Sequence, residues 1–449
     1  MVSQITTLLQ RFRHDWTAHL TGEAIRDACR RAGHAWRERT LDPVTTLQLF
    51  LLQVLHGNTA CAHLPHLSGL KFSASAYCQA RARIPLKVFQ TLLEQMTQGL
   101  QGAADSAARW RGHRVFHMDG SGFSMPDTEE LREHFGQPGG QRVGCGFPVA
   151  HTLVLMHAGA GFLLRILAAP LRTHDASQAA QVHPELQEDD VLVGDRAFCS
   201  YAQMALLFQR KVHVVLRIHQ RQIVDFTPHR PHAVPGKKAA PGLPRSRWVK
   251  RLGKDDQLVE WLRPTACPAW MPREQYQALP EQLLLRELRV RIVRRGWRTG
   301  EVTLVTTLLD PRRYPARELA ALYVQRWQVE TNLRHLKQTL GLDPLRCETV
   351  AGVLKELAMF ALAYNLVRLA MHASAWVQGV APERISFVDA LRWLCAEHSG
   401  KTLANLTINP ERPGRYEPRV RKRRPKQFPL MKKPRQELQQ EFLSKQFAA

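Results

Sequence analysis

Hydrophobic residues recur at helical spacing in the segment 316–340. Residues three and four positions apart share one side of an α-helix, so apolar residues at this spacing are typical of a helix with one face in the core. The segment therefore predicts a helix that packs against the protein interior through one stripe. The apolar positions of this stripe are Leu322, Val329, Leu333, Leu336 and Leu340.

A second stripe on the same predicted helix is polar. Tyr323, Glu330 and Lys337 recur every seven residues, so successive members lie within about 20° of one another around the helix axis. Arg326 follows one turn after Tyr323 on the same side. A carboxylate among phosphate-binding groups suggests a metal ligand beside nucleic acid. The alternative is a solvated helix in which Glu330 pairs with Arg334 and Lys337.

Two short apolar runs that predict buried strands end in an aspartate. The run 114–119 ends at Asp119, and the glycine-rich residues 120–122 after it predict a tight turn. The run 190–195 ends at Asp195. Ligands gather at the carboxyl ends of parallel strands, so both carboxylates are candidates for one site. As alternatives, Asp195 could cap the next helix, and Asp119 could be a turn residue.

The neighbouring runs predict more of an α/β domain. Residues 148–156 and 162–167 are apolar runs on either side of a glycine-containing segment, which predicts a hairpin. A helix at 201–211 and a strand at 212–218 complete a β-α-β unit after Asp195.

Residues 220–300 interrupt this pattern. Nine of the 27 prolines lie between Pro228 and Pro280, which predicts loops, and short alternating runs between them predict antiparallel strands. A further core strand is predicted at 302–307. The segment therefore reads as a β-rich insertion within one domain.

The first 105 residues predict helices. Ser73 is a suitable N-cap for a short helix that contains Gln79, Arg81 and Arg83. Arginine pairs with guanine and glutamine with adenine in the major groove, so this helix is predicted to contact DNA. The alternative is a surface helix of a helical bundle.

The charge of the chain favours a polyanionic partner. Lys+Arg number 63 against 39 Asp+Glu, which gives a formal charge of +24 and a pI of about 10.3, so nucleic acid is the leading candidate. Residues 412–435 hold eleven Lys and Arg and one acid, a net +10 (11 − 1), which predicts phosphate binding without sequence preference. The alternative is a solvated tail. Its densest cations are Arg421, Lys422, Arg423 and Arg424.

The sequence fits membrane proteins, secreted proteins and zinc-binding proteins less well. The apolar segment 350–372 predicts a core or interface helix, and Asn365 and Arg368 keep it short of the roughly 18 apolar residues of a membrane span. The N-terminus does not read as a secretory signal, so a cytoplasmic protein is expected. Eight cysteines without a Cys-x-x-Cys pair predict reduced thiols, and Cys61–His66 lacks the paired spacing of a zinc site.

Two aspartates at strand ends and a glutamate on a later helix, in a basic protein, predict phosphoryl transfer on DNA. Carboxylate oxygens suit Mg²⁺, which keeps waters and takes phosphate oxygens as further ligands. Two such ions about 3.5–4 Å apart hold the attacking and leaving oxygens in line.

These residues resemble the motifs of one family. The chain is similar to the DDE transposases of bacterial insertion sequences, in the group with a Tyr-x-x-Arg-x-x-x-Glu helix signature followed by a lysine. The order of the acids agrees, with Asp119 in Asp-Gly-Ser, Asp195 in Gly-Asp-Arg-Ala-Phe, an insertion and then the glutamate. The similarity extends over most of the chain. The helix signature is matched in full by Tyr323, Arg326, Glu330 and Lys337.

The resemblance implies a multidomain α/β fold. Residues 106–345 would form a ribonuclease H-like catalytic domain, a mixed five-stranded sheet with helices, interrupted at 220–300 by a β-rich insertion that closes over the DNA end. Residues 1–105 would form an all-α DNA-binding domain. Residues 346–449 would form a C-terminal helical region and a basic tail.

The resemblance also implies an activity. The protein would bind the terminal inverted repeats of an insertion sequence and catalyse end cleavage and strand transfer, in several relatives through a hairpin on the transposon end. Asp119, Asp195 and Glu330 would be both the catalytic residues and the ligands of Mg²⁺, with Mn²⁺ as a substitute and two ions when DNA is bound. Its partners would be double-stranded DNA, as terminal repeats and target, and a second copy in a homodimer on paired ends in the bacterial cytoplasm and nucleoid.

Further DNA contacts follow from the same resemblance. Tyr323, Arg326 and Lys337 would hold phosphates near the cleaved end. Trp297 or Trp261 would stack on a flipped base, although a tryptophan buried in a strand is the competing interpretation. Two other functions stay open: a metal-dependent nuclease without strand transfer, and an inactive DNA-binding regulator, against which the intact acids argue.

Overall fold

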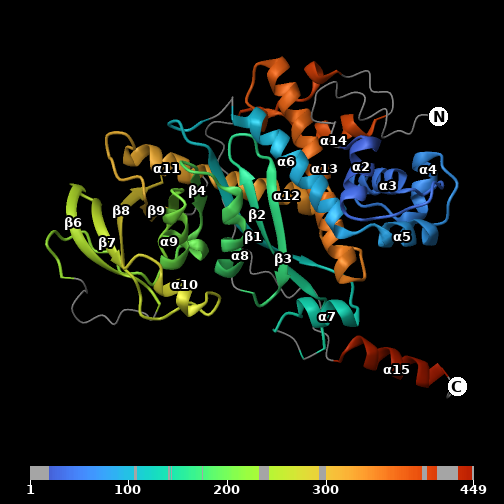
Figure 1. Cartoon of the computed structure of the whole chain (residues 1–449), viewed down its shortest axis with the longest axis horizontal. Helices are drawn as coiled ribbons and strands as arrows, with labels where there is room; N and C mark the ends of the chain where they lie inside the picture. Colours follow the sequence, from blue (N-terminus) through green and yellow to red (C-terminus); the bar gives the residue numbers. More distant parts are fainter. Residues whose placement is uncertain are drawn as a thin grey trace.

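The computed structural model describes residues 20–105, 109–139, 142, 144–173, 175–231, 242–292, 300–396, 402–411 and 433–446. Over these ranges the protein is a mixed α/β structure built on one sheet of nine strands in the order β3-β2-β1-β4-β5-β9-β8-β7-β6 (Figure 1). The predicted mixed α/β class is confirmed. The strands are β1 Val115–Ser124, β2 Val149–His157, β3 Leu163–Pro170, β4 Val191–Gly194, β5 His213–Arg217, β6 Arg245–Gly253, β7 Asp256–Leu262, β8 Gln282–Arg291 and β9 Glu301–Thr306.

The first five strands contain the predicted hairpin and β-α-β unit. β1, β4 and β5 are parallel neighbours, and β2 and β3 pair antiparallel on the other side of β1. β1 is longer than predicted, because Gly120–Gly122 pair with residues 151–153 of β2. The predicted turn after Asp119 is therefore wrong. The antiparallel partner β2 keeps the chain extended beyond the point where β4 ends at Gly194.

The other four strands extend the same sheet. β6, β7, β8 and β9 are antiparallel neighbours, and β9 also pairs with β5 through Val215↔Thr306. Because β9 pairs on both sides, the strands of the 220–300 segment continue the ladder, so the sheet has nine strands where five were predicted. The predicted strand at 302–307 is confirmed as β9.

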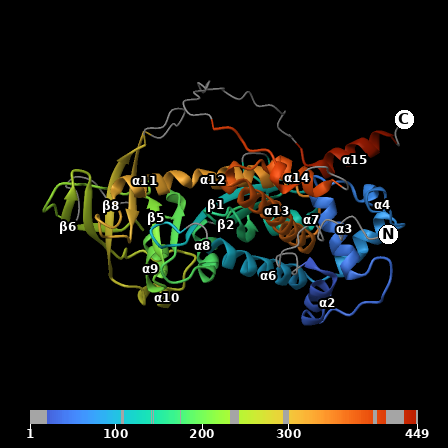
Figure 2. The ribbon, with the colours of Figure 1, turned by 90° about the horizontal axis from the view of Figure 1, so that it is seen from above.

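Helices cover both faces of the central strands. α8 (Asp175–Val182) and α9 (Tyr201–Gln209) lie against one face, and α11 (Ala316–Gln325) and α12 (Trp327–Arg334) against the other. Figure 2 shows α11 and α12 end to end along the sheet. The remaining helices of the sheet region are α7 (Glu129–Phe135) and α10 (Arg273–Gln277).

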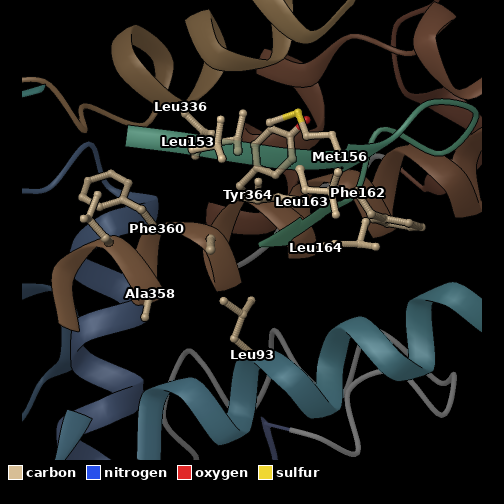
Figure 3. Packing of buried hydrophobic residues seen from close by; sticks show 14 of the residues in the cluster. Leu93, Leu153, Met156, Phe162, Leu163, Leu164, Leu336, Ala358, Phe360 and Tyr364 are labelled. Atoms are coloured by element: carbon tan, nitrogen blue, oxygen red, sulfur yellow. The ribbon is translucent and has the colours of Figure 1, made fainter. Parts of the chain in front are cut away.

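The N-terminal helices pack on a long helix from the C-terminal part of the chain. α13 (Val350–Gln378) lies between the sheet and this helical group, and it contacts α3, α6 and β3. Leu93 of α6, Leu163 of β3 and Phe360 of α13 belong to one hydrophobic cluster (Figure 3). The group comprises α2 Gly22–Arg31, α3 Pro43–Leu55, α4 Leu64–Ser68, α5 Ala74–Arg83 and α6 Leu86–Asp105, while α14 Phe387–Cys395 and α15 Arg435–Gln446 follow α13.

α13 is the one helix in the described residues that is long and apolar enough to cross a membrane, but 78% of its apolar window is buried inside the protein. Its polar residues also bond within the protein. The Asn365 side-chain amide accepts from the Leu163 backbone N–H and donates to the Leu163 carbonyl, both at 2.9 Å. The Arg368 Nε donates to the Ala160 carbonyl at 3.1 Å. α13 is therefore a core helix fixed to the β2–β3 turn.

Candidate active site between the sheet and helices α11 and α12

Strand pairing places Asp119 beside Asp195. β1 and β4 run parallel with Val115 opposite Val191 and Met118 opposite Gly194. The next residue on each strand is the aspartate, so the two carboxylates follow in the same register. Side chains alternate along a strand, which puts Asp119 on the face of Val115 and Asp195 on the face of Val191. Both valines belong to the hydrophobic cluster beneath α11, so both acids face the α11–α12 side of the sheet.

The helix that carries the signature is broken at Arg326. α11 ends at Gln325, α12 begins at Trp327, and residues 335–339 form a π-helical turn. At the break the Arg326 N–H donates to the Tyr323 carbonyl, and the Val329 N–H donates to the Arg326 carbonyl. One continuous helix was therefore the wrong prediction, because tighter hydrogen bonding interrupts it here. The predicted apolar stripe is confirmed as buried at Leu322, Val329, Leu333, Leu336 and Leu340.

The break directs two side chains of the signature at the acids. The Tyr323 hydroxyl donates to Asp195 Oδ1 at 3.3 Å. The Arg326 guanidinium lies between the other two acids, with Nη1 3.3 Å from Asp119 Oδ2 and Nη2 3.3 Å from Glu330 Oε1. The three acids therefore converge on one pair of side chains.

These contacts test the alternative roles of the three acids as a helix cap, a turn residue and a surface ion-pair partner. Asp195 occupies the N-cap position of a short 3₁₀ turn, but its side chain makes no capping hydrogen bond. Asp119 Oδ1 accepts from the Gly120 N–H at 2.9 Å inside a strand, not in a turn. Glu330 forms its ion pair with Arg326. Helix capping and turn chemistry therefore do not account for the two aspartates.

Burial sets the protonation of the site. It raises the pKa of Asp119 to about 6, and the nearby charges of Glu330 and Asp195 act in the same direction. Arg326 and the Gly120 N–H oppose this shift by stabilising the carboxylate. Burial also raises the pKa of Tyr323 to about 12, so its hydroxyl is a neutral donor at physiological pH.

His117 is a neighbour of the acids that the sequence analysis did not select. It lies two residues before Asp119 on β1 and so on the same face of the sheet. The side chain is buried, and burial together with the Arg326 charge lowers its pKa to about 3. Its Nε2 has no hydrogen-bond partner in the described part of the chain. The two-residue spacing from Asp119 was the available signal.

Lys337 lies farther along β1 than the acids. It belongs to the π-helical turn, its Nζ is 4.9 Å from the centre of the Phe123 ring, and it is 4.0 Å from Asp343 Oδ2. Asp343 also accepts from the Ser124 hydroxyl at 2.8 Å. Lys337 therefore marks the end of β1, next to the carboxylates but not among them.

The three carboxylates fit a hard divalent cation. They offer only oxygen donors, which Mg²⁺ and Mn²⁺ prefer. Burial is the main cause of the raised pKa of Asp119, and repulsion by Glu330 and Asp195 adds to it, while the charge that Arg326 places between Asp119 and Glu330 opposes it. A divalent ion held by Asp119, Asp195 and Glu330 would relieve the same repulsion.

The predicted DNA-contact helix is present as α5, but its side chains divide between interior and surface. Ser73 is confirmed as its N-cap, accepting from the Ala76 N–H. Arg81 is turned inward: its guanidinium lies 4.5 Å from the centre of the Phe50 ring and 3.3 Å from Gln53 Oε1. Packing thus takes Arg81 away from the role of DNA contact predicted for it.

Arg83 is the arginine of α5 that faces outward. It is exposed and lines a cavity of about 470 Å³ at the end of the helix. Arg37, Arg39 and Trp36 line the same cavity. This surface therefore combines three guanidinium groups with one aromatic side chain.

The remaining predicted DNA contacts divide into described and undescribed residues. Trp261 is fully buried, and its Nε1 donates to Glu287 Oε1 at 2.8 Å, so it is a core tryptophan. Trp297 and the basic residues Arg421, Lys422, Arg423 and Arg424 lie outside the described residues.

Comparison with known proteins identifies a family for the chain. A family model described as the transposase DDE domain matches residues 110–366, which include the three acids. Among curated proteins, the transposase InsG for insertion sequence element IS4 of Escherichia coli K12 is 26% identical over 385 residues, covering 80% of this chain and 78% of InsG. The putative transposase InsZ of the same organism is 28% identical over 137 residues, covering 30% of this chain and 46% of InsZ.

Among solved structures, a piggyBac transposase synaptic complex with hairpin DNA matches with a TM-score of 0.43 and 10% identity, over 88% of this chain and 80% of that one. This likeness is too weak to support an inference about the site. The family model, in contrast, covers more than half of the chain. The protein therefore belongs to the family of DDE transposases.

Proposed function

We propose that Asp119, Asp195 and Glu330 are the catalytic carboxylates of this transposase. As a member of the DDE family, the protein is an enzyme that cleaves DNA and transfers DNA strands. The observation that carries the assignment is convergence: the two aspartates follow in register on adjacent parallel strands, and the glutamate reaches the same place from α12.

DDE transposases use divalent metal ions, and we assign Mg²⁺ to this one, with Mn²⁺ as a substitute and two ions when DNA is bound. Bound ions would neutralise the charge that develops on the phosphate and lower the pKa of the attacking water or hydroxyl. The chain contributes three carboxylates that neighbouring side chains hold on one face of the sheet.

Arg326 and Tyr323 position these carboxylates. The Arg326 guanidinium donates to both Asp119 and Glu330, and the Tyr323 hydroxyl orients Asp195. A guanidinium has five N–H donors, so Arg326 has donors left for a DNA phosphate. Lys337, at the end of β1, lies where the backbone of a DNA end at Asp119 would continue.

Double-stranded DNA, as terminal inverted repeats and target, is the substrate that the charge and the family support. We assign the N-terminal helices, through Arg83, Arg37 and Arg39, to contact with the terminal repeats. The exposed cations of β6 belong to the segment 220–300 that would close over the DNA end.

The strand order β3-β2-β1-β4-β5 is the arrangement expected of a ribonuclease H-like catalytic domain, and we propose this description for residues 106–345 with the insertion at 220–300. Residues 1–105 and 346–449 would serve DNA binding. We further propose that the enzyme acts as a homodimer on paired ends, in the cytoplasm on nucleoid DNA, and that a hairpin on the transposon end is an intermediate.

A cleavage assay tests the assignment. The substrate is a DNA fragment that spans the terminal repeat of the element, incubated with wild type, Glu330→Gln or the control Glu318→Gln in Mg²⁺. Glu318 lies in the same helical segment but pairs with Arg111 at the surface. We expect nicking at the repeat boundary for wild type and the control and none for Glu330→Gln, with DNA binding kept by all three.

The DNA products distinguish the hairpin route, strand transfer and simple nuclease activity. A slowly migrating species on a denaturing gel indicates a hairpin, and joining to a target fragment indicates strand transfer, whereas nicking without joining indicates a nuclease. DNA binding without cleavage in either Mg²⁺ or Mn²⁺ would contradict the catalytic assignment and leave a DNA-binding regulator.

A further inference from the structure

A second cluster of titratable side chains lies at the opposite end of the strands that carry the acids. It consists of His113, Asp189 and His213, whose ligand atoms all lie within 4.8 Å of one another. Within the described ranges it is the one such group of three His, Cys, Asp or Glu side chains. Its members come from positions far apart in the chain, so the fold has gathered them.

The strand register explains the gathering. His113 lies two residues before Val115 of β1, and Asp189 two residues before Val191 of β4, which is the partner of Val115. His213 begins β5, and its N–H donates to the Asp190 carbonyl at 2.7 Å. All three positions therefore share the α11 face of the sheet with the acids. Six residues along β4, roughly 20 Å, separate Asp189 from the active-site end.

His113 is already held in the manner of a metal ligand. Its Nδ1 lies 2.6 Å from the Asp189 carbonyl oxygen, which can only accept, so Nδ1 carries the proton. Nε2 then accepts a hydrogen bond from the Tyr314 hydroxyl, 2.7 Å away, and a bound metal ion would replace this hydrogen bond. Histidines that bind metals commonly donate their other ring N–H to a carbonyl, because this fixes the tautomer and the ring orientation.

His213 and Asp189 complete the donor set. The Nε2 of His213 is 3.7 Å from Asp189 Oδ1, and its Nδ1 is 3.2 Å from the Thr307 hydroxyl. The His213 ring is half-buried, and its Nε2 faces the same carboxylate that lies beside His113. The Asp189 side chain is 76% exposed and can rotate toward both rings.

We propose that His113, Asp189 and His213 form a second metal site, for Zn²⁺, separate from the catalytic carboxylates. Two imidazoles and a carboxylate are a donor set that Zn²⁺ takes in preference to Mg²⁺. Bonds of about 2.0–2.2 Å in a tetrahedral site place ligand atoms roughly 3.4 Å apart, so small rotations of the three side chains would close the site. The Tyr314 hydroxyl or a water supplies the fourth position.

The site would act on the catalytic sheet as a clamp. It would join the residues just before β1 and β4 to the first residue of β5, and through Tyr314 it reaches the segment that leads into α11, the helix that presents Tyr323. Zinc bound here holds the amino ends of the strands whose opposite ends carry Asp119 and Asp195. The effect is on stability and positioning, with no contact to the reacting phosphate.

Cobalt provides a probe that distinguishes the two sites. Four-coordinate Co²⁺ with histidine ligands absorbs visible light far more strongly than six-coordinate Co²⁺ on oxygen ligands. The full-length protein, stripped of metal, is titrated with Co²⁺ and then with Zn²⁺ as competitor. Two variants, His213→Gln and Asp189→Asn, each remove one ligand of the proposed site. His219→Gln is the matched histidine control, and Asp119→Asn weakens the catalytic site.

We expect one equivalent of strongly absorbing Co²⁺, displaced by Zn²⁺, in wild type, His219→Gln and Asp119→Asn. His213→Gln and Asp189→Asn should weaken binding by at least about tenfold, and the rise in melting temperature with Zn²⁺ should vanish in both. Circular dichroism checks that Asp189→Asn, a surface change, is folded. Absence of the strong band in folded wild type, or its loss in Asp119→Asn only, would overturn the proposal.

Discussion

The two halves of the nine-stranded sheet differ in how they are covered. Every side chain of β4 is buried, because α8 and α9 cover one face of its half and α11 and α12 the other. Along β7 buried and half-buried side chains alternate, and in β6 Ser246 is the single buried residue. One half, the closed half, is therefore covered on both faces, whereas the outer strands β6 and β7 of the other half, the open half, bury at most one face.

This difference separates two tasks in one sheet. The closed half fixes the register that brings Asp119 beside Asp195, and it excludes water enough to shift the pKa of Asp119. The open half ends in an edge strand whose exposed cations Arg245, Lys250 and Arg251 keep it from pairing with other strands. We propose that the same cations contact the DNA backbone, so that the closed half would carry the chemistry and the open half would hold DNA.

The largest effect should come from the acids in the closed half. Asp119→Asn and Asp195→Asn each remove a ligand charge, and we expect either to lower cleavage at least about a hundredfold, with DNA affinity unchanged. The double variant should be little worse than either single one, because the carboxylates act as a unit. Single-turnover cleavage measures this, with Asp310→Asn as control. Additive losses in the double variant would argue against a shared site.

A buried ion pair in each half tests whether the halves unfold together. Arg114 pairs with Asp190 in the closed half, and Arg286 with Asp256 in the open half, where Arg286 also donates to the Tyr314 carbonyl. Removing either arginine leaves a buried charge, so Arg114→Met and Arg286→Met should each cost about 3–5 kcal/mol.

Because β9 joins the two halves, we expect a single unfolding transition in urea, and both variants should lower its midpoint concentration. Fluorescence and circular dichroism would follow this transition. Arg286→Met combined with Asp256→Leu should recover most of the loss, since no charge is then left unpaired. Two separate transitions, with only one moved by each variant, would show that the open half unfolds independently.

The pKa of Asp119 predicts a smaller, pH-dependent effect. Its folded pKa of about 6 lies above an unfolded value of about 3.9, so its contribution to stability is full below pH ~3.9 and is lost as the pH rises through about 6. Without divalent ions at pH 8, Asp119→Asn should exceed wild type by roughly 2–3 kcal/mol in free energy of unfolding. Urea titrations in chelator should show this gap closing towards pH 4. A constant gap would mean that Asp119 does not titrate near 6.

The smallest effect should come from the open edge. Replacing Arg245 and Lys250 by alanine should reduce DNA affinity a few-fold. The slope of log affinity against log salt concentration should become less steep by about one per lost phosphate contact. Cleavage at saturating DNA should stay at the wild-type rate. Lys211→Ala, which removes an exposed lysine paired with Glu188, is the control for general charge. An unchanged salt dependence of the affinity would show that β6 does not contact DNA.

Local patterns in the sequence anticipated much of this structure. The apolar stripe of the 316–340 helix, the Ser73 N-cap and the β2–β3 hairpin follow from spacing and residue type. The meeting of Asp119, Asp195 and Glu330 was expected from strand ends and from the resemblance to transposases, and their shared contacts with Tyr323 and Arg326 agree with it.

Other features depend on contacts between distant segments. No glycine or proline marks the break at Arg326, whose side chain is held by Asp119 and Glu330. Nothing near Arg81 in the sequence indicates that its guanidinium would pack against Phe50 and contact Cys347. Tertiary packing decides these positions.

The position of α13 has a consequence for synthesis of the protein. Helices α3 and α6 complete their hydrophobic cluster only with α13, whose first residue, Val350, leaves the ribosome long after Asp105 ends α6. Until then the apolar faces of the N-terminal helices stay exposed, so these helices cannot complete their folding before the segment that holds all three acids has been translated. Truncated products that end before α13 would therefore be exposed to proteolysis and would compete poorly with the complete enzyme for transposon ends.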